Sequence, residues 1–316
     1  MPQAGFQQAI ESTIDIPLQG MPLLRAGTGT NGQRFVNVLF ESHTNPLTKG
    51  HSLYTFKRWG LANNTQPTGG AATGRGIHYW EGSGKLYTVL NNKIFSGTTD
   101  LGVTLAASSG RVWFTETAPT SSTRLLIVSD GTDNYNIETN DTITQIDEVD
   151  DAQYPTSNVG SIVFLNDYLL QAQEDGEIWN TEPDAYTSWL GTAVEDANAF
   201  GDELVALARM RDQLVVFGRY SIEFYFDNGT TPTPLLRISQ NTLRMGMAHA
   251  NSLAQAGDTL CWVAEAPAVG EGTRSVWLME PGKVVRISTE VIDRFVTAEG
   301  SSISSCTAWM ERIGGH

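Results

Sequence analysis

The sequence has little of what a disulfide scaffold or a cysteine-based metal site requires. Its 316 residues include two cysteines, Cys261 and Cys306, which is too few for either arrangement. We expect both to be reduced thiols that pack as small apolar side chains. The five histidines are also sparse, and none is paired at metal-ligand spacing. We therefore expect no metal site and no cofactor.

Charged residues are few, and positive charge is scarcer than negative charge. The chain has 20 Lys and Arg against 35 Asp and Glu, for a formal net charge of −15. This balance argues against a protein that grips nucleic acid through its phosphates, because such a protein needs many cations. It is compatible with a wall past which DNA slides, since a repulsive lining discourages adhesion.

Long apolar runs are missing as well. No stretch approaches the ~20 apolar residues of a membrane-spanning helix, so we expect no membrane span. The first basic residue is Arg25, and Glu11 and Asp15 precede it. This start is not typical of a signal peptide, and we expect a protein that is made in a cytoplasm.

Nucleotide-binding and catalytic motifs are incomplete. Residues 26–32 (AGTGTNG) match G-x-G-x-x-G, but a strand-like run follows where the fingerprint needs a helix. Residues 82–85 (GSGK) lack the upstream glycine of a phosphate loop, and the chain has no G-x-S-x-G elbow. The acidic run 147–151 (DEVDD) lacks the spacing of a calcium loop. A carboxylate pair for glycoside hydrolysis stays open, because such a pair is set in space.

What the chain does have is short strands and tight turns. Residues 202–227 predict three consecutive strands: apolar runs at 204–208 and 214–217, then an aromatic alternation at 222–226. Arg211-Asp212 marks the first turn between them. Because three strands alone cannot bury both faces of a sheet, this meander needs neighbours of the same kind.

Four further units follow the same template of strand, turn, strand, turn and strand. The five units begin near Gly76, Gly110, Gly160, Asp202 and Ala250, which are 34 to 50 residues apart. Repeats of roughly this length built from short strands are typical of a β-propeller. We therefore predict an all-β fold whose β-propeller-like body repeats three- to four-stranded meanders. A single twisted sandwich is the alternative.

The ends of the body are less regular. A sixth unit is predicted to begin with a strand at Ser301, and the chain stops at its first turn, so the last blade is incomplete. Either the natural protein continues past His316, which we favour, or a strand at 35–40 fills the gap. Residues 51–59 also alternate like a short strand. Segments 184–191 and 195–210 have some helical spacing, although we expect little helix.

Large aromatic residues lie on or beside these strands. Because aromatic side chains bury much area there, we expect a core that includes Trp113, Trp179, Phe224 and Trp277. A platform for sugar rings is the alternative role for the tryptophans. We divide the chain into an N-terminal arm with lead-in strands at 1–74 and a propeller body at 75–316.

Several segments resemble one protein family. They are RGIHYWEGSGKLYTVLNNKIFSG (75–97), SGRVWFTE (109–116) and, most specifically, ALARMRDQLVVFGRYSIEFYFDNGT (206–230). RFVNVLFESHTNPLTKGHSLYTFKRWG (34–60) is similar to the family's opening segment, and 275–295 to the segment after its central meander. The family is the packaged-DNA stabilisation proteins of short-tailed bacteriophages, also called tail hub or nozzle proteins. Residues 1–33 and the shorter length depart from it.

The resemblance implies a non-enzymatic virion protein of the phage tail. Such a protein forms a ring, taken to have six copies, below the head-to-tail adaptor, retains packaged DNA and becomes part of the ejection channel. Implied partners are further copies, the adaptor, a tail needle or plug, and a tailspike or fibre. The rival function is a propeller that binds or cleaves glycans.

The residues that contact partners are expected on long loops that interrupt the repeat. Two loops, 229–238 and 264–274, are marked by proline and glycine. The residues that we predict at a partner interface are Pro232, Pro234, Pro267 and Glu271. The arm at 1–33 is a further candidate.

Overall fold

The computed structural model describes residues 38–44, 51–57, 72–118, 123–197, 200–265 and 273–310. The chain divides into two units, residues 1–63 and 64–316. The first unit contains an antiparallel hairpin of β1 (Val38–Thr44) and β2 (His51–Lys57), paired from Val38↔Lys57 to Thr44↔His51. These strands overlap the runs predicted at 35–40 and 51–59. No helix in the described ranges is long and apolar enough to cross a membrane.

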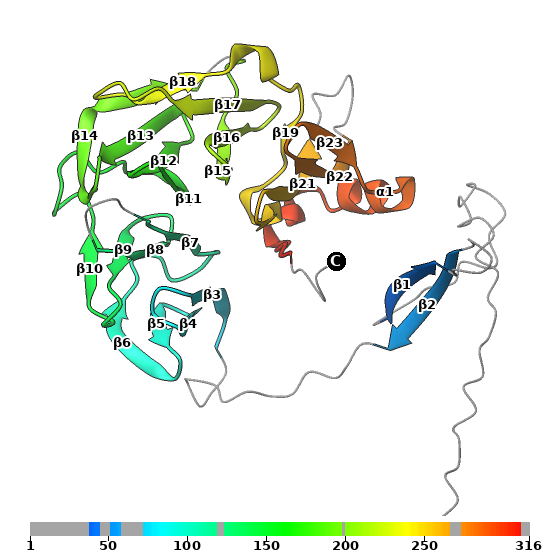
Figure 1. Cartoon of the computed structure of the whole chain (residues 1–316), viewed down its shortest axis with the longest axis horizontal. Coiled ribbons are helices and arrows are strands. Elements are labelled where there is room, and N and C mark those ends of the chain that lie inside the picture. The colour runs from blue at the N-terminus through cyan, green and yellow to red at the C-terminus, as the bar shows by residue number, and fades with distance from the viewer. Residues whose placement is uncertain are drawn as a thin grey trace, which may run out of the picture. The chain divides into compact units, whose positions relative to one another are not determined.

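The second unit is built from five antiparallel sheets, which are the blades of the propeller (Figure 1). Blade 1 consists of β3 (Gly74–Trp80), β4 (Lys85–Leu90), β5 (Lys93–Ser96) and β6 (Thr99–Thr104). Blade 2 consists of β7 (Trp113–Glu116), β8 (Leu126–Ser129), β9 (Asn134–Ile137) and β10 (Ile143–Ile146). Blade 3 consists of β11 (Asn158–Leu165), β12 (Tyr168–Gln173), β13 (Glu177–Glu182) and β14 (Ala185–Asp196).

Blade 4 consists of β15 (Leu204–Met210), β16 (Gln213–Gly218), β17 (Ile222–Asp227) and β18 (Leu235–Arg237). Blade 5 consists of β19 (Gly246–Met247), β20 (Ala254–Ala256), β21 (Thr259–Glu265), β22 (Arg274–Glu280) and β23 (Lys283–Arg286). The helices are α1 (Glu290–Ala298) and 3-10 turns at Ser239–Asn241, Ala250–Ser252 and Gly300–Ser305. In blades 1 to 4 the chain runs from an inner strand to an outer strand (Figure 1).

The meander predicted at 202–227 is confirmed. Strands β15, β16 and β17 pair in sequence order, and Met210 lies opposite Gln213 across the Arg211-Asp212 turn. A turn of the same length joins β11 and β12, where Asn166 and Asp167 both have positive φ, 46° and 69°. Asn and Asp tolerate this conformation better than other non-glycine residues. The all-β, propeller-like fold of repeated meanders is thereby confirmed.

The two predicted helical segments are wrong. Residues 185–196 form the long outer strand β14, and residues 204–210 form the inner strand β15. Tyr186 and Trp189 on β14 are buried in an apolar cluster that includes Ile127 of blade 2. A local pattern that fits a helix is overridden here, because packing between blades rewards the extended conformation.

The strand predicted from Ser301 is also wrong. Residues 300–305 form a 3-10 turn instead, and 306–310 form no strand. The hydroxyls of Ser304 and Ser305 donate to the carbonyls of Ser301 and Ser302, three residues back. Such local bonds offer the backbone an alternative to a sheet ladder. The sixth blade therefore stays incomplete in the described part of the chain.

The core lies within and between neighbouring blades. Trp80 and Trp262 are fully buried, and Trp262 packs edge-on against Phe217 of blade 4 with ring centroids 5.3 Å apart. Of the predicted core residues, Phe224 is buried, with 6% of its surface exposed. The predicted tryptophans 113, 179 and 277 are partly buried. They pack against the apolar clusters that join blade 2 to blade 3 and blade 4 to blade 5.

A polar contact latches blade 1 to blade 2. Asp141, in the loop before β10, accepts hydrogen bonds from Lys85 Nζ and Tyr87 Oη, each at 2.7 Å. Burial disfavours the charged carboxylate, but the bonds from Lys85 and Tyr87 outweigh this effect and lower the pKa of Asp141. Because the pKa is lower in the folded state, ionised Asp141 contributes stability above its unfolded pKa of about 3.9.

This contribution is expected to disappear as the pH falls through the lowered pKa of Asp141. We predict that Asp141→Asn lowers the free energy of unfolding at pH 7 and that the difference from the wild type shrinks below about pH 4. Urea unfolding of both proteins at pH 7, 5 and 3 measures the difference. If the difference in unfolding free energy stayed constant with pH, the contact of Asp141 with Lys85 and Tyr87 would stabilise the fold through packing and not through charge.

Candidate binding site on the propeller axis

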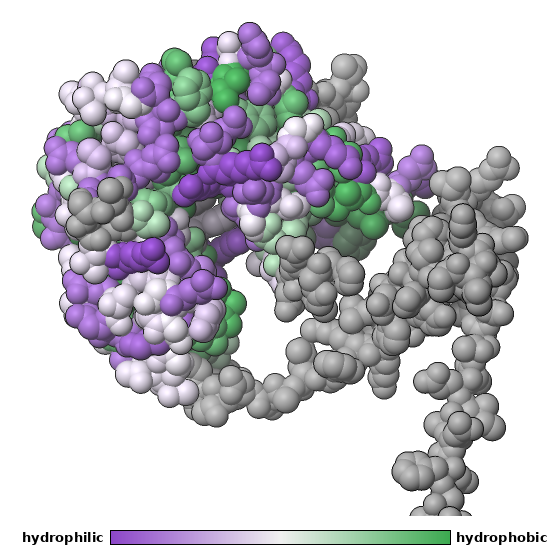
Figure 2. Space-filling model, viewed as in Figure 1, coloured by the Kyte–Doolittle hydropathy of each residue, from purple (hydrophilic) through white to green (hydrophobic). Residues whose placement is uncertain are grey.

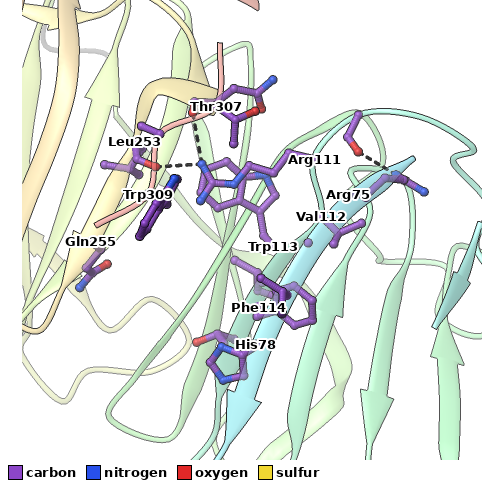
Figure 3. Close-up of a pocket in the computed structure, with 18 of the residues that line it drawn as sticks. Arg75, His78, Arg111, Val112, Trp113, Phe114, Leu253, Gln255, Thr307 and Trp309 are labelled. Carbon is purple, nitrogen blue, oxygen red and sulfur yellow. Dashed lines mark hydrogen bonds between the residues drawn. The ribbon is translucent and has the colours of Figure 1, made fainter. Parts of the chain in front are cut away.

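A pocket of about 1190 Å³ lies where the inner strands of the blades converge. Strands β3, β7, β11 and β15 contribute to its wall, and residues 304–309 contribute a further part (Figure 3). Each of these inner strands pairs with one following strand of its own blade. Among the described residues, their axis-facing edges have no strand partner.

Arg75 of β3 is fully engaged by the protein. Only 6% of its surface is exposed. Its guanidinium donates to four main-chain carbonyls, those of Asn91, Ala107, Ser109 and Gly110, at 2.6 to 3.1 Å. Arg75 therefore fixes the connection between blades 1 and 2, and it has little capacity left for a ligand.

Arg111 lies two residues before β7, and only part of its guanidinium has a partner among the described residues. Its guanidinium lies over the ring of Trp113, 4.1 Å from the centroid. Nη1 donates to the carbonyl of Leu253 at 2.8 Å and, at 3.4 Å, to that of Asn251 (Figure 3). Burial lowers the pKa of Arg111. In the described part of the chain, no carboxylate lies within ion-pair distance of it.

His78 and Glu116 form the other polar group of the pocket. His78 Nε2 lies 2.8 Å from Glu116 Oε1, and its ring stacks on Phe114 at 5.4 Å between centroids. Glu116 is the one carboxylate among the described lining residues. Glycoside hydrolysis normally uses two carboxylates that flank the scissile bond. The described lining does not bring such a pair together.

A segment of the chain itself, residues 304–309 without Cys306, lines this pocket. The amide of Ala308 donates to the carbonyl of Asn251 at 2.9 Å, and Asn251 Nδ2 donates to the carbonyl of Ser304 at 2.8 Å. Trp309 follows, with 71% of its surface exposed, and it is part of the lining (Figure 3). The pocket wall thus already contains irregular backbone beside an aromatic side chain.

A second hollow of about 730 Å³ lies at blade 4. Arg244 covers the ring of Phe200 at 4.6 Å, and Tyr220 also lines the hollow. Its other cation, Arg219, lies 3.0 Å from Glu265 Oε2, so this arginine is neutralised. No group of His, Cys, Asp and Glu among the described residues has the arrangement of a metal site.

Two of the four predicted interface residues lie in the described part of the chain. Pro232 is exposed in the loop between β17 and β18, whereas Pro234 is buried, and its carbonyl accepts the amide of Asn228. Pro267 and Glu271 lie outside the described residues. Of the predicted core residues, Trp113 lines the axial pocket. Sequence reasoning missed Arg111, whose only local signal was its place two residues before Trp113.

The fold and the axial pocket define a β-propeller with five blades in the described residues. A protein-family model described as "Bacteriophage P22 Gp10, beta-propeller" matches residues 33–313. The chain therefore belongs to this bacteriophage family, whose members are structural phage proteins. The propeller predicted from the sequence and the suspected family are both confirmed.

Solved structures with a similar trace are distant in sequence. A catalytically inactive variant of virginiamycin B lyase from Staphylococcus aureus with quinupristin has 13% identity and a TM-score of 0.43, covering 80% of this chain and 78% of that chain. A streptogramin B lyase has 12% identity and a TM-score of 0.40, with coverages of 70% and 85%. The AfRom2 CNH domain has 13% identity and a TM-score of 0.41, and the match covers 76% of this chain and 78% of that domain's chain. A search of curated proteins gave no match.

Proposed function

We propose that this chain is a tail hub, or nozzle, subunit of a short-tailed phage. It attaches below the head-to-tail adaptor, retains the packaged DNA and forms part of the ejection channel. The observation that carries the proposal is the family match over residues 33–313, which spans nearly all of the described chain. In this function the propeller is a rigid scaffold, and its loops make the contacts with partners.

The working form is a ring of several copies, taken as six, in the virion and assembled in the host cytoplasm. A ring of six carries a formal charge of −90 (6 × −15), which discourages DNA from adhering to its wall. Further partners are the tail needle or plug and a tailspike or fibre. Within the described residues, the exposed loop around Pro232 is the candidate for contact with these partners.

The decisive experiment mixes the full chain with adaptor-bearing capsids that lack it. Native mass spectrometry and electron microscopy of the particles report the number of copies that bind, and nuclease-accessible DNA reports leakage. We expect several copies below the adaptor and less leakage. A chain that ignores the capsids and instead binds or cleaves host glycans would overturn the hub function.

Ring formation needs two surfaces on each copy, because head-to-tail contacts close a ring. The described residues include two exposed apolar surfaces, one on blade 1 (Ile77, Tyr79 and Leu86) and one on α1. On α1, Val291, Ile292 and Phe295 are all exposed, Phe295 by 66% (Figure 2). Clustered exposed apolar residues typically mark interaction sites. We therefore assign α1 to the contact with the next copy.

Replacing Phe295 with serine is expected to weaken ring assembly about tenfold or more while the melting temperature stays within about 2 °C of the wild type. The matched control is Val149→Ser, since Val149 is 87% exposed and lies between β10 and β11, away from α1. Sedimentation velocity across a concentration series measures assembly. Equal assembly by the two variants would remove α1 from the subunit contact.

A further inference from the structure

We propose that the axial pocket binds an extended acidic peptide of a partner protein, with a carboxylate on Arg111 and the peptide backbone along the inner strands. This inference rests on the residues that line the pocket and on Arg111. It does not depend on the proposed ring of subunits. The ligand class follows from the charge of the lining, from the unsatisfied capacity of Arg111 and from the shape of the cavity.

The charge of the lining is opposite to that of the chain. The described lining residues include three arginines (75, 111 and 209) and one glutamate, a formal +2 with histidine neutral. The whole chain carries −15. A local positive lining in an acidic protein attracts an anionic group to this place and not to the surface around it.

Arg111 is the partly buried cation with capacity for that group. Arg75 is consumed by four carbonyls, whereas Arg209 is exposed and uses Nε and Nη1 on the carbonyls of Arg211 and Phe164. Only Nη1 of Arg111 has a hydrogen-bond acceptor among the described residues. Burial lowers the pKa of Arg111, which reflects a cation without a compensating anion. A carboxylate matches the fork of a guanidinium bidentately.

The size and the walls of the pocket favour a peptide. A cavity of about 1190 Å³ is far larger than one carboxylate and takes several residues of an extended chain. Among the described residues, the inner strands have no strand partner on this side, although side chains already bond the amide and carbonyl of Phe164 and the amide of Leu207. Their remaining backbone groups offer donors and acceptors, as in strand addition. Residues 307–309 line the same pocket, and Trp309 presents an exposed ring to an apolar neighbour of the acidic residue.

Nucleic acid is the less suitable polyanion. Its affinity rises with the number of phosphates that Lys and Arg neutralise, and among the described lining residues only Arg111 and Arg209 keep guanidinium nitrogens without an acceptor. The surrounding net charge of −15 repels a long polyanion more than a short peptide with one or two carboxylates. Two such guanidiniums suit one or two carboxylates better than a run of phosphates.

The test uses the full chain and a fluorescein-labelled heptapeptide in which two glutamates flank a phenylalanine. The control peptide has glutamines in place of the glutamates, and an eight-nucleotide thymidine strand serves as competitor. Fluorescence anisotropy at two salt concentrations gives the dissociation constants. We expect the acidic peptide to bind about tenfold or more tightly than the amide peptide, and more weakly at higher salt.

Two variants place the binding on the pocket. Arg111→Gln is expected to weaken acidic-peptide binding about tenfold or more, whereas Arg294→Gln on exposed α1 leaves it unchanged. Because Arg111 also bonds the loop of blade 5, a second variant is needed that keeps this arginine. Arg111 Nη1 and the amide of Ala308 both bond the carbonyl of Asn251, and the adjacent Thr307 also lines the pocket. Thr307→Glu is therefore expected to bring a carboxylate near Arg111 and to block binding, whereas Thr307→Gln is not. Circular dichroism checks that each variant is folded.

The proposal fails on any of three results. Equal affinity for the acidic and amide peptides would remove the role of the carboxylate. Unchanged binding in folded Thr307→Glu would place the peptide elsewhere on the molecule. Displacement by the thymidine strand at lower concentrations than the unlabelled acidic peptide would identify a nucleic-acid site instead.

Discussion

Arg75→Gln is expected to lower the free energy of unfolding by about 3–5 kcal/mol, one of the largest effects of a single substitution in this protein. Arg75 is 6% exposed and its guanidinium satisfies four carbonyls from three places in the chain, at residues 91, 107 and 109–110. Glutamine has one amide group and cannot reach all four. A hydrogen bond to a charged donor contributes about 1.5–3 kcal/mol, and its loss costs less where water can reach the carbonyl.

Differential scanning calorimetry of the full chain measures this effect. For a unit of this size, about 3–5 kcal/mol corresponds to a fall in melting temperature of roughly 10 °C. Arg75→Lys keeps the charge but loses the planar guanidinium with its several donors. Its melting temperature is therefore expected to lie between those of the wild type and Arg75→Gln. Arg294→Gln on α1 removes an exposed arginine and should change little. If Arg75→Gln and Arg294→Gln were equally stable, the four hydrogen bonds of Arg75 would make no net contribution to the free energy of unfolding.

The blades were predictable from the sequence because their signals are local. Alternating apolar residues indicate strands, and Asn-Asp or Arg-Asp pairs mark two-residue turns, so β11–β12 and β15–β17 follow from short windows. The order of pairing within each blade is also local, since each strand pairs with the next. The same locality explains the errors at 185–196 and 204–210, where contacts from other strands outweigh the helical spacing.

The axial pocket was not predictable because its contacts join distant parts of the chain. Arg111 bonds a carbonyl 142 residues away, and Arg75 bonds carbonyls 16 to 35 residues away. Neither residue has a motif around it. The 3-10 turn at Gly300–Ser305 was missed for a different reason, since its serine hydroxyls make local bonds that apolar periodicity does not register. Part of the loop predicted at 229–238 is the outer strand β18, and Pro234 beside it is buried, which apolar and turn patterns alone did not indicate.

The contact between blades 4 and 5 leads to the second large expected effect, at Gly246. Its strand β19 runs so close to the end of β16 that a Cβ atom would lie 2.3 Å from the carbonyl oxygen of Gly218 and from Arg219 C. Both are backbone atoms, so no side-chain rotation relieves the clash. The carbonyl of Gly246 also accepts the indole N–H of fully buried Trp262 at 3.1 Å. Moving β19 therefore disturbs the core of both blades.

Gly246→Ala is expected to lower the free energy of unfolding by about 3 kcal/mol or more, beyond the usual cost of one extra methyl group in a core. Urea unfolding followed by tryptophan fluorescence measures it and reports the environment of Trp262 at the same time. The matched control is Gly74→Ala, because a Cβ at Gly74 meets no atom within 4 Å and its φ is not positive. This control should leave stability unchanged or raise it by about 0.5 kcal/mol through the unfolded chain. Equal stability of the two alanine variants would mean that β19 can move away from Gly218 freely and that blades 4 and 5 are not rigidly joined there.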